Sequence, residues 1–386
     1  MAIEAGTPPP AAGQVSAVFC APLRYVQGPG VSGQIAAQMR AVGLSGPVLV
    51  VAGNAAIGRL APTWAAAFAA AGWTHRVRLF GAESSRREIA ALAAEAASLS
   101  ARVVVAAGGG KALDAARAAA AASRLPFVSC PTICSTDAPT SALSVIYADE
   151  GPARGTVEAY EIHARSPDLV LVDTLVIAES PPRYLAAGIG DAVSTFYEAR
   201  AAAAAGRPNM RGGRSTRAAL ALAQLCHDVV FTDGVAALAE CRGRRPGAAL
   251  ERVVEAATLL SGLGFESAGL AAAHAVHNGL TALPETRRML HGEKVAFGTL
   301  VQMVLDGTPA DEFATVVRFC RAVGLPVTLA ELGLPAATMA DHDAIATRAT
   351  QAGETIHNLP QPVTAADVAA AIREADGRAG VIAGRT

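Results

Sequence analysis

The chain has 386 residues, of which 52% are hydrophobic and 17% charged, enough to bury one large core or two ordinary ones. Its formal net charge is −1 and its arginines are scattered, which excludes the basic stripe of a nucleic-acid-binding surface. Six dispersed cysteines are typical of reduced thiols rather than of a disulfide framework, so we expect a cytoplasmic protein with structural cysteines.

The first residues do not have the pattern of a secretory signal. They carry Glu4 and Pro8 to Pro10 where a signal would have a basic region and an apolar run, so we expect a flexible tail at residues 1–17. Alanine-rich segments further on predict helices. None reaches 18 strongly apolar residues free of charges or helix breakers, so we expect no membrane partner.

Short β-rich runs alternate with helical stretches between Tyr25 and Asp173. Strands are expected near residues 47–51, 75–80, 103–105, 126–129 and 169–172, with helices near 61–71 and 86–99. This rhythm predicts a parallel sheet covered on both faces. From Tyr184 onward the pattern is helical with almost no strand candidates, so we expect an α/β domain at 18–177 and an all-α domain at 178–386.

A glycine turn follows the third of these expected strands. Gly108, Gly109 and Gly110 end at Lys111, where a helix begins. Such a turn lets backbone amides approach a pyrophosphate, and the new helix presents its positive end to the anion. It is neither a Walker A loop nor a GxGxxG motif, because Ala112 follows the lysine and the glycines are consecutive.

Lysine occurs only at Lys111 and Lys294, and all the remaining residues in the Lys+Arg count are arginines. A chain with this bias should keep lysine mainly where a compact ammonium cannot be exchanged for a planar guanidinium. Both lysines are therefore candidate functional residues.

The turn after the next expected strand is rich in hydroxyls. It runs from Pro131 to Ser141, carries Asp137, and is stiffened by Pro131 and Pro139. In open parallel sheets, ligands bind beyond the carboxyl ends of the strands, and both turns fall there.

A carboxylate and a set of histidines in the helical half predict a metal site. Asp191 ends Gly188-Ile-Gly-Asp191, which we expect to precede a helix, while His274 and His277 share one helical face and His291 follows 14 residues later. One carboxylate with two imidazoles suits catalytic zinc and non-haem iron. Periodicity does not decide between His274 and His277.

Together these segments resemble the glycerol dehydrogenase branch of the iron-containing, or group III, alcohol dehydrogenases. The resemblance spans almost the whole chain, and its specific runs include Ser135-Thr-Asp-Ala-Pro-Thr-Ser141, His274-Ala-Val-His-Asn-Gly279 and His291-Gly-Glu-Lys294. It implies a dehydroquinate synthase-like fold with a Rossmann-like dinucleotide-binding domain, a helical metal-binding domain and an active site between them.

Carried over by position, the resemblance implies the metal ligands Asp191, His274 and His291, and the catalytic residues Asp137, against the polyol hydroxyls, and His277. It implies cofactor contacts at Gly109, Gly110, Lys111, Asp114, Thr132, Ser135, Ser141, Leu143 and Tyr147. It further implies NAD as cofactor, Zn²⁺ or alternatively Fe²⁺ as the metal, and assembly as a homo-oligomer.

Two positions depart from the family pattern. Gly53, in Ala52-Gly53-Asn54, replaces the acidic residue that grips the adenosine ribose in relatives, which leaves NADP open beside NAD. Cys134 replaces an alanine in the hydroxyl-rich turn.

The resemblance implies a glycerol dehydrogenase that forms dihydroxyacetone, and also oxidises 1,2-diols, by hydride transfer from a metal-bound alkoxide to NAD(P). Three alternatives stay open. An NAD(P)H-dependent reductase of 2-oxo acids would need Lys294 or an arginine for the carboxylate. A dehydroquinate-synthase-like lyase would need a more basic pocket, and a non-catalytic nucleotide-binding protein would leave the metal set without a purpose.

Overall fold

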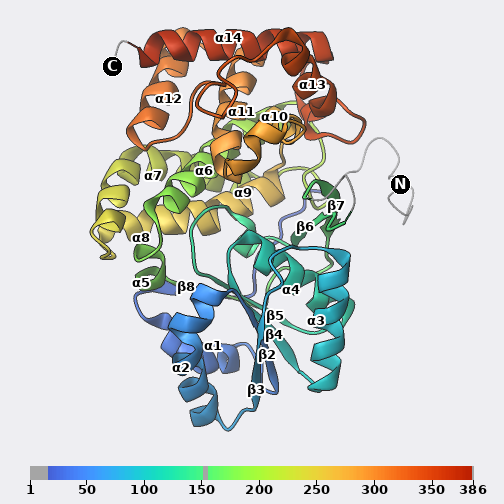
Figure 1. Ribbon diagram of the computed structural model, residues 1–386, viewed down its shortest axis with the longest axis vertical. Coiled ribbons are helices and arrows are strands. Elements are labelled where there is room, and N and C mark those ends of the chain that lie inside the picture. The colour runs from blue at the N-terminus through green and yellow to red at the C-terminus, as the bar shows by residue number, and fades with distance from the viewer. Residues whose placement is uncertain (1–15, 151–154, 385–386) are drawn as a thin grey trace.

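The computed structural model describes residues 16–150 and 155–384 and has an α/β part and a helical part (Figure 1). A parallel six-stranded sheet forms the centre of the α/β part, in the order β1-β8-β5-β4-β2-β3. Its strands are β1 (Tyr25–Gly28), β2 (Val48–Ala52), β3 (His75–Leu79), β4 (Val103–Gly108), β5 (Phe127–Pro131) and β8 (Leu169–Asp173). The expected doubly covered parallel sheet is confirmed.

Helices cover both faces of this sheet because its central strands are apolar on both sides. Val48 and Val50 pack toward α1 (Ile35–Ala41) and α2 (Asn54–Ala71). The alternate residues Leu49 and Val51 pack toward α3 (Arg86–Ser98) and α4 (Gly110–Ala122). Continuous valine runs therefore serve two separate apolar layers.

Two strand features were not expected from the sequence. β1 has only four residues, all half-buried, and gives a weak signal. β6 (Leu143–Tyr147) and β7 (Val157–Ile162) form an antiparallel hairpin, whose second strand alternates between half-buried and exposed positions. The hairpin lies over the end of α4 that follows the glycine turn.

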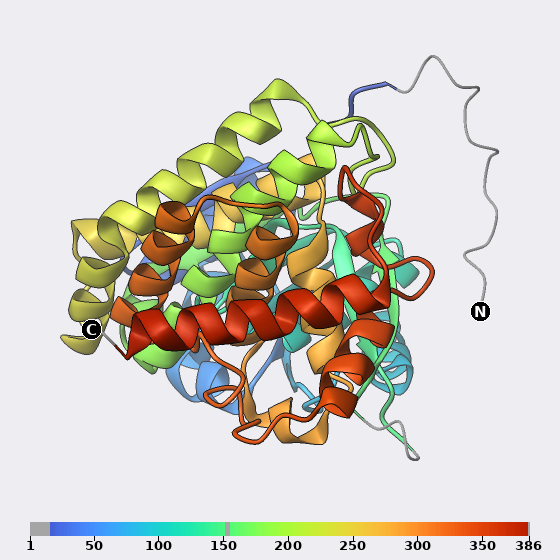
Figure 2. The same cartoon turned by 90° about the horizontal axis from the view of Figure 1, so that it is seen from above.

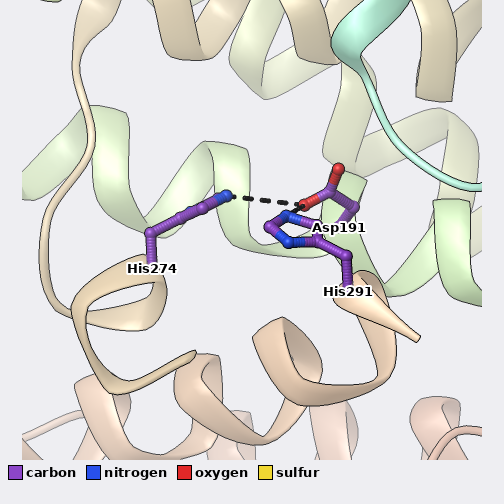
Figure 3. A group of neighbouring side chains, drawn as sticks. All are labelled: Asp191, His274 and His291. Atoms are coloured by element: carbon purple, nitrogen blue, oxygen red, sulfur yellow. Dashed lines mark ion pairs between the residues drawn. The ribbon is translucent and has the colours of Figure 1, made fainter. Parts of the chain in front are cut away.

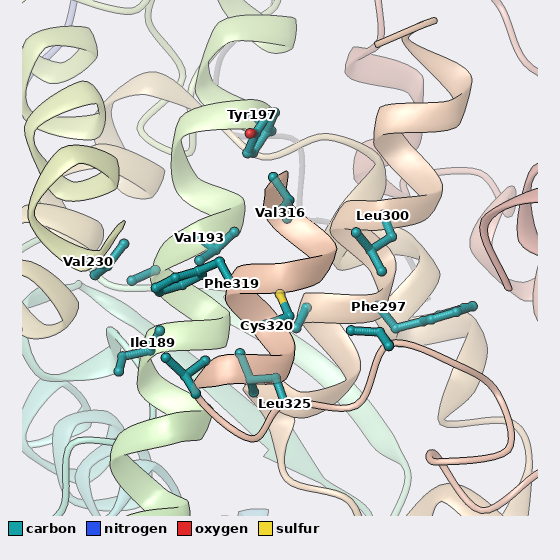
Figure 4. Packing of buried hydrophobic residues seen from close by; sticks show 14 of the residues in the cluster. Ile189, Val193, Tyr197, Val230, Phe297, Leu300, Val316, Phe319, Cys320 and Leu325 are labelled. Atoms are coloured by element: carbon teal, nitrogen blue, oxygen red, sulfur yellow. The ribbon is translucent and has the colours of Figure 1, made fainter. Parts of the chain in front are cut away.

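The helical part packs around a second, larger core. Its helices are α5 (Thr174–Ala178), α6 (Pro182–Ala204), α7 (Arg217–Arg242), α8 (Ala248–Glu255), α9 (Ser261–Ala268), α10 (Ala272–Leu280), α11 (His291–Leu305), α12 (Ala310–Ala322), α13 (Met339–Ala349) and α14 (Ala365–Ala383). A π-helical turn, Ala256–Leu260, joins α8 to α9. Side chains from α6, α7, α11 and α12 interdigitate in this core (Figure 4), and α14 lies across its outer end (Figure 2).

The boundaries of the expected domains stay predictions. The sheet ends at Asp173, and the proposed boundary after residue 177 falls within α5. Of the expected tail, residues 1–15 lie outside the described residues, whereas Ala17 forms a β-bridge with Arg214 of the helical part.

The expectation that Gly188 to Asp191 precedes a helix is wrong. These residues lie inside α6, which begins at Pro182. Glycine is a poor helix former, so the two glycines predicted that the helix would begin only after them. In the structure, glycine is instead needed inside α6, because the helix backbone approaches the backbone of a neighbouring loop. A Cβ added at Gly188 would lie 2.4 Å from the Cys134 carbonyl oxygen, so glycine permits α6 to touch the loop after β5.

Helix α7 has the length and mean hydropathy, 1.2 over 18 residues, of a membrane span. It nevertheless carries Asp228 and Asp233 and packs along α6, α8 and α9. The segment Ala248–Ala268 with Ala272–Leu280 also passes the test when taken as one span, but it is bent by 103°. Core helices of globular proteins reach the same length and mean hydropathy as a membrane span. The expected lack of a membrane partner stays a prediction.

Candidate metal and nucleotide site

Three side chains from different helices meet where the helical part faces the sheet. Asp191 lies on α6, His274 on α10 and His291 at the start of α11 (Figure 3). The Asp191 Oδ1 atom is 3.5 Å from His274 Nε2 and 3.1 Å from His291 Nε2, and one ligand atom of each residue lies within 4.8 Å of the others. The structure thus brings together the three predicted metal ligands.

The second nitrogen of each imidazole is held by a hydrogen bond. Glu198 Oε2 lies 2.6 Å from His274 Nδ1, so that nitrogen carries the proton of the neutral ring, which leaves the Nε2 lone pair for a metal. His291 Nδ1 lies 3.0 Å from His277 Nε2. With His291 as donor in this pair, its Nε2 also presents a lone pair toward Asp191.

This arrangement fits a divalent cation. The Asp191 side chain is fully buried, yet its Oδ1 accepts no hydrogen bond from any residue of the described chain. A carboxylate oxygen and two imidazole lone pairs that face one another repel without a positive charge between them. One oxygen and two nitrogen donors match catalytic zinc and non-haem iron sites, which leave further positions for substrate or water.

The local charges agree with this interpretation. Burial opposes a charged His274 ring, but Glu198 and Asp191 together raise the pKa of His274 well above its usual value. Although burial favours the neutral carboxyl, the His291 and His274 rings hold the pKa of Asp191 below its usual value. The site therefore keeps Asp191 ionised, and a cation would supply the positive charge that a protonated histidine otherwise brings.

Asp137 is fixed beside the predicted metal ligands. Its backbone N–H donates to Asp191 Oδ2 at 3.1 Å, and its own Oδ2 accepts from Ser261 Oγ at 2.7 Å. Ser261 is in turn 2.8 Å from Thr195 Oγ1. Burial and the neighbouring Asp191 charge raise the pKa of the Asp137 carboxyl, an effect that a cation beside Asp191 would oppose.

The predicted nucleotide residues gather at the carboxyl ends of β4 and β5. Gly109 is the N-cap residue of α4 and makes no side-chain cap, so the first amides of the helix stay available to a ligand. Lys111 Nζ lies 4.5 Å from the centre of the Tyr147 ring and 2.8 Å from Glu83 Oε2. The loop after β5 supplies Thr132, Ser135 and Ser141, and β6 supplies Leu143 and Tyr147.

Two predicted site residues have their polar atoms occupied within the chain. Asp114 is buried and binds Arg117 through Oδ1 at 2.7 Å and the Val145 N–H through Oδ2 at 3.2 Å. His277 Nδ1 lies 3.1 Å from Asn278 Oδ1 while its Nε2 contacts His291. We therefore propose that Asp114 holds β6 and that His277 holds His291, and that neither touches the ligand through these atoms.

Sequence reasoning missed Glu198 and Ser261. Glu198 follows Asp191 by two helical turns, and a second carboxylate in a buried apolar helix was an available signal. Ser261 gave none, because a single serine within an apolar stretch is ordinary. Its position follows the π-helical turn, an element that often occurs at functional sites.

Comparison with known proteins agrees with this geometry. Residues 22–174 match the model of the iron-containing alcohol dehydrogenase family. The chain is 45% identical to a glycerol dehydrogenase of Escherichia coli O6:H1 over 93% of its length and 96% of that protein. It is 42% identical to a glycolaldehyde reductase of Halobacterium salinarum, over 94% of its length and 98% of that protein.

A solved structure is also similar throughout. The crystal structure of a probable glycerol dehydrogenase from Sinorhizobium meliloti 1021 superposes with a TM-score of 0.89 at 36% identity, covering 95% of this chain and all of that one. The chain belongs to the iron-containing alcohol dehydrogenase family. It is an alcohol dehydrogenase of the glycerol dehydrogenase-like type, an oxidoreductase that uses a divalent metal and a nicotinamide dinucleotide.

Proposed function

We propose that this enzyme oxidises glycerol to dihydroxyacetone, and 1,2-diols to the corresponding hydroxyketones, with Asp191, His274 and His291 holding the metal and Asp137 binding a second substrate hydroxyl. The observation that carries the proposal is the position of Asp137 beside Asp191. The relatives named as glycerol dehydrogenases support the substrate.

Asp137 is suited to recognise a hydroxyl next to the reacting one. Ser261 occupies its Oδ2 atom, which fixes the carboxylate plane and leaves Oδ1 to accept a hydrogen bond. A substrate with a neighbouring hydroxyl can satisfy this oxygen of a buried side chain, whereas a monohydric alcohol leaves it unpaired and so loses binding energy.

When bound, the metal supplies a Lewis acid that lowers the pKa of an alcohol and so favours hydride loss from the adjacent carbon. The residues of the chain do the remaining work. Glu198 and His277 orient the two histidine rings, Asp137 orients the polyol, and the glycine turn with Lys111 holds the nucleotide. Zinc is our proposed metal, and the same donors would also hold Fe²⁺.

NAD is the proposed cofactor. Gly53 follows β2 and has open space around its Cα, with no described atom within 4 Å of an added Cβ. Gly53 lacks the carboxylate that would repel the 2′-phosphate of NADP, so NADP should also bind. We expect a smaller preference for NAD than an acidic residue at this position would give.

Initial rates on metal-loaded protein test the proposal. The comparison should include the oxidation of glycerol, 1,2-propanediol and 1-propanol with NAD or NADP. It should also include the reduction of pyruvate with the reduced form of each cofactor. We expect the two polyols to exceed 1-propanol in kcat/KM. Asp137→Asn should lower kcat/KM for glycerol by about 10- to 100-fold, the equivalent of one charged hydrogen bond, and leave 1-propanol nearly unchanged.

Asp149→Asn is the control, because Asp149 is an acidic residue that pairs with Arg87, away from the metal ligands. Faster reduction of pyruvate than oxidation of any alcohol would favour the 2-oxo acid reductase instead. Equal losses for glycerol and 1-propanol in Asp137→Asn would contradict a role in diol recognition.

A further inference from the structure

Lys294 is a buried cation, and no described residue is its partner. It lies on α11, one helical turn after His291, and is 8% exposed. Within the described residues its ammonium group makes no hydrogen bond or ion pair. The adjacent Glu293 does not serve it, because that carboxylate binds the Arg183 guanidinium and the Leu290 N–H.

The environment of Lys294 disfavours its charged form. Burial and, to a lesser extent, the Lys111 ammonium lower the pKa of Lys294 to about 8, although the Glu293 carboxylate raises it. Burial, His291 and Lys294 all lower the pKa of the neighbouring His277. Lys294 therefore lies within electrostatic reach of both the glycine turn and the metal ligands.

A buried charge that is not paired destabilises a fold. The same lysine would be stabilised if an anion entered between Lys294 and Lys111. Lys111 belongs to the first turn of α4, whose N-cap residue Gly109 makes no side-chain cap. A pyrophosphate is the anion whose double charge and oxygen acceptors match two ammonium groups and a set of backbone amides.

We propose that Lys294 binds a phosphate oxygen of the dinucleotide from the helical part, opposite the glycine turn and Lys111. The proposal rests on the dinucleotide of the proposed function and adds a contact from the metal-binding half of the molecule. Because Lys294 and His291 share α11, the nucleotide would be tied to the helix that carries a metal ligand. The only two lysines of the chain would thus bind the same ligand.

Binding of ADP-ribose to metal-loaded protein tests this contact without turnover. Lys294→Met keeps the length and apolar stem of the side chain but removes its charge. We expect it to weaken ADP-ribose binding by about 10- to 100-fold, measured by calorimetry, and to reduce the salt dependence of binding. Adenosine, which lacks phosphate, should bind equally to parent and variant.

Two further variants serve as controls. Lys294→Arg keeps the charge and should bind ADP-ribose more tightly than Lys294→Met. Arg318→Met removes an exposed cation from α12, where it contacts Thr315, and should leave the affinity unchanged. Unchanged ADP-ribose affinity in Lys294→Met would overturn the proposal.

Thermal unfolding separates this role from a structural one. Without nucleotide, Lys294→Met should have a Tm equal to or higher than that of the parent, because the buried charge is gone. The difference should shrink as the pH rises from about 8 toward the usual lysine value, 10.5, because Lys294 then loses its proton in the folded parent. A lower Tm at neutral pH would indicate a structural role and contradict the proposal.

The groups that face Lys294 are Lys111 from α4, His277 from α10 and Glu293 from its own helix. His277 titrates below this pH range, because its pKa is lowered. Lys111 and Glu293 are present in both the parent and Lys294→Met, so their own titration contributes to both Tm values.

The nucleotide contact of Lys294 and the proposed polyol activity can be tested separately. If Lys294→Met bound ADP-ribose normally but bound pyruvate less well, the lysine would pair with a substrate carboxylate and the proposal would be wrong. If glycerol were not a substrate but ADP-ribose binding still fell in the variant, the nucleotide contact would stand and only the proposed polyol activity would fail.

Discussion

Glu198 controls which atom of His274 can bind a metal. Its Oε1 accepts the backbone N–H groups of Ala271 and His274, at 2.9 and 3.0 Å, and its Oε2 accepts from His274 Nδ1. The carboxylate thus fixes both the start of α10 and the tautomer of the ring. A hydrogen-bonded partner of this kind typically contributes a factor of 10 to 100 in metal affinity.

Replacement of Glu198 by glutamine should reverse this tautomer. The two backbone donors would hold the amide oxygen at the position of Oε1, so the amide NH₂ would face Nδ1 and drive the ring proton to Nε2. We expect Glu198→Gln to weaken zinc binding by about 10- to 100-fold, measured by competition with a chromogenic chelator. ADP-ribose affinity should not change.

Glu240→Gln is the matched control, since Glu240 also accepts a backbone N–H, that of Leu250, but lies on α7 away from the site. Zinc affinity equal to that of the parent in Glu198→Gln would show that His274 does not depend on this carboxylate.

Much of the arrangement of elements could be predicted from the sequence, because valine runs, alanine-rich helices and glycine turns have strong local signals. The choice between His274 and His277 could not, because both lie on one face of α10 and only their ring partners differ. Ser261 and the β6-β7 hairpin were likewise beyond reach, since their roles come from contacts between distant segments. The interior position of Gly188 in α6 was missed for the same reason.

Close contact between α6 and α11 positions Asp191 against His291. A Cβ added at Gly292 would lie 1.8 Å from the Ala187 carbonyl oxygen, so only glycine permits this spacing. The two ligands therefore depend on a backbone contact between helices as well as on their own side chains.

Gly292→Ala should push α11 away from α6 and separate His291 from Asp191. We expect at least a tenfold loss of zinc affinity and a destabilisation of about 1–3 kcal/mol, measured by chelator competition and urea unfolding. Gly377→Ala on α14 has open space around it and should be neutral or slightly stabilising. Metal affinity that survived in Gly292→Ala would contradict the proposed role of this contact.

The two halves of the molecule meet through the loop after β5. Asp137 N–H binds Asp191, Thr140 Oγ1 donates to the Thr258 carbonyl at 2.9 Å, and Ala142 N–H donates to Glu266 Oε1 at 2.8 Å. The α/β part thereby brings the glycine turn and Asp137 to the proposed metal ligands of the helical part. Assembly as a homo-oligomer stays a prediction. A surface hollow of about 570 Å³ lies between α6, α7 and α12, and none of the residues that line it is a proposed site residue.

Anomalous X-ray diffraction at the absorption edge of the metal, on crystals of active enzyme with bound nucleotide, shows directly which side chains hold the ion. We expect one strong peak per chain, at about 2.0–2.2 Å from Asp191 Oδ1, His274 Nε2 and His291 Nε2, that disappears in a folded His274→Ala variant. A fully active enzyme whose peak lies away from these three atoms, or is absent, would contradict this assignment.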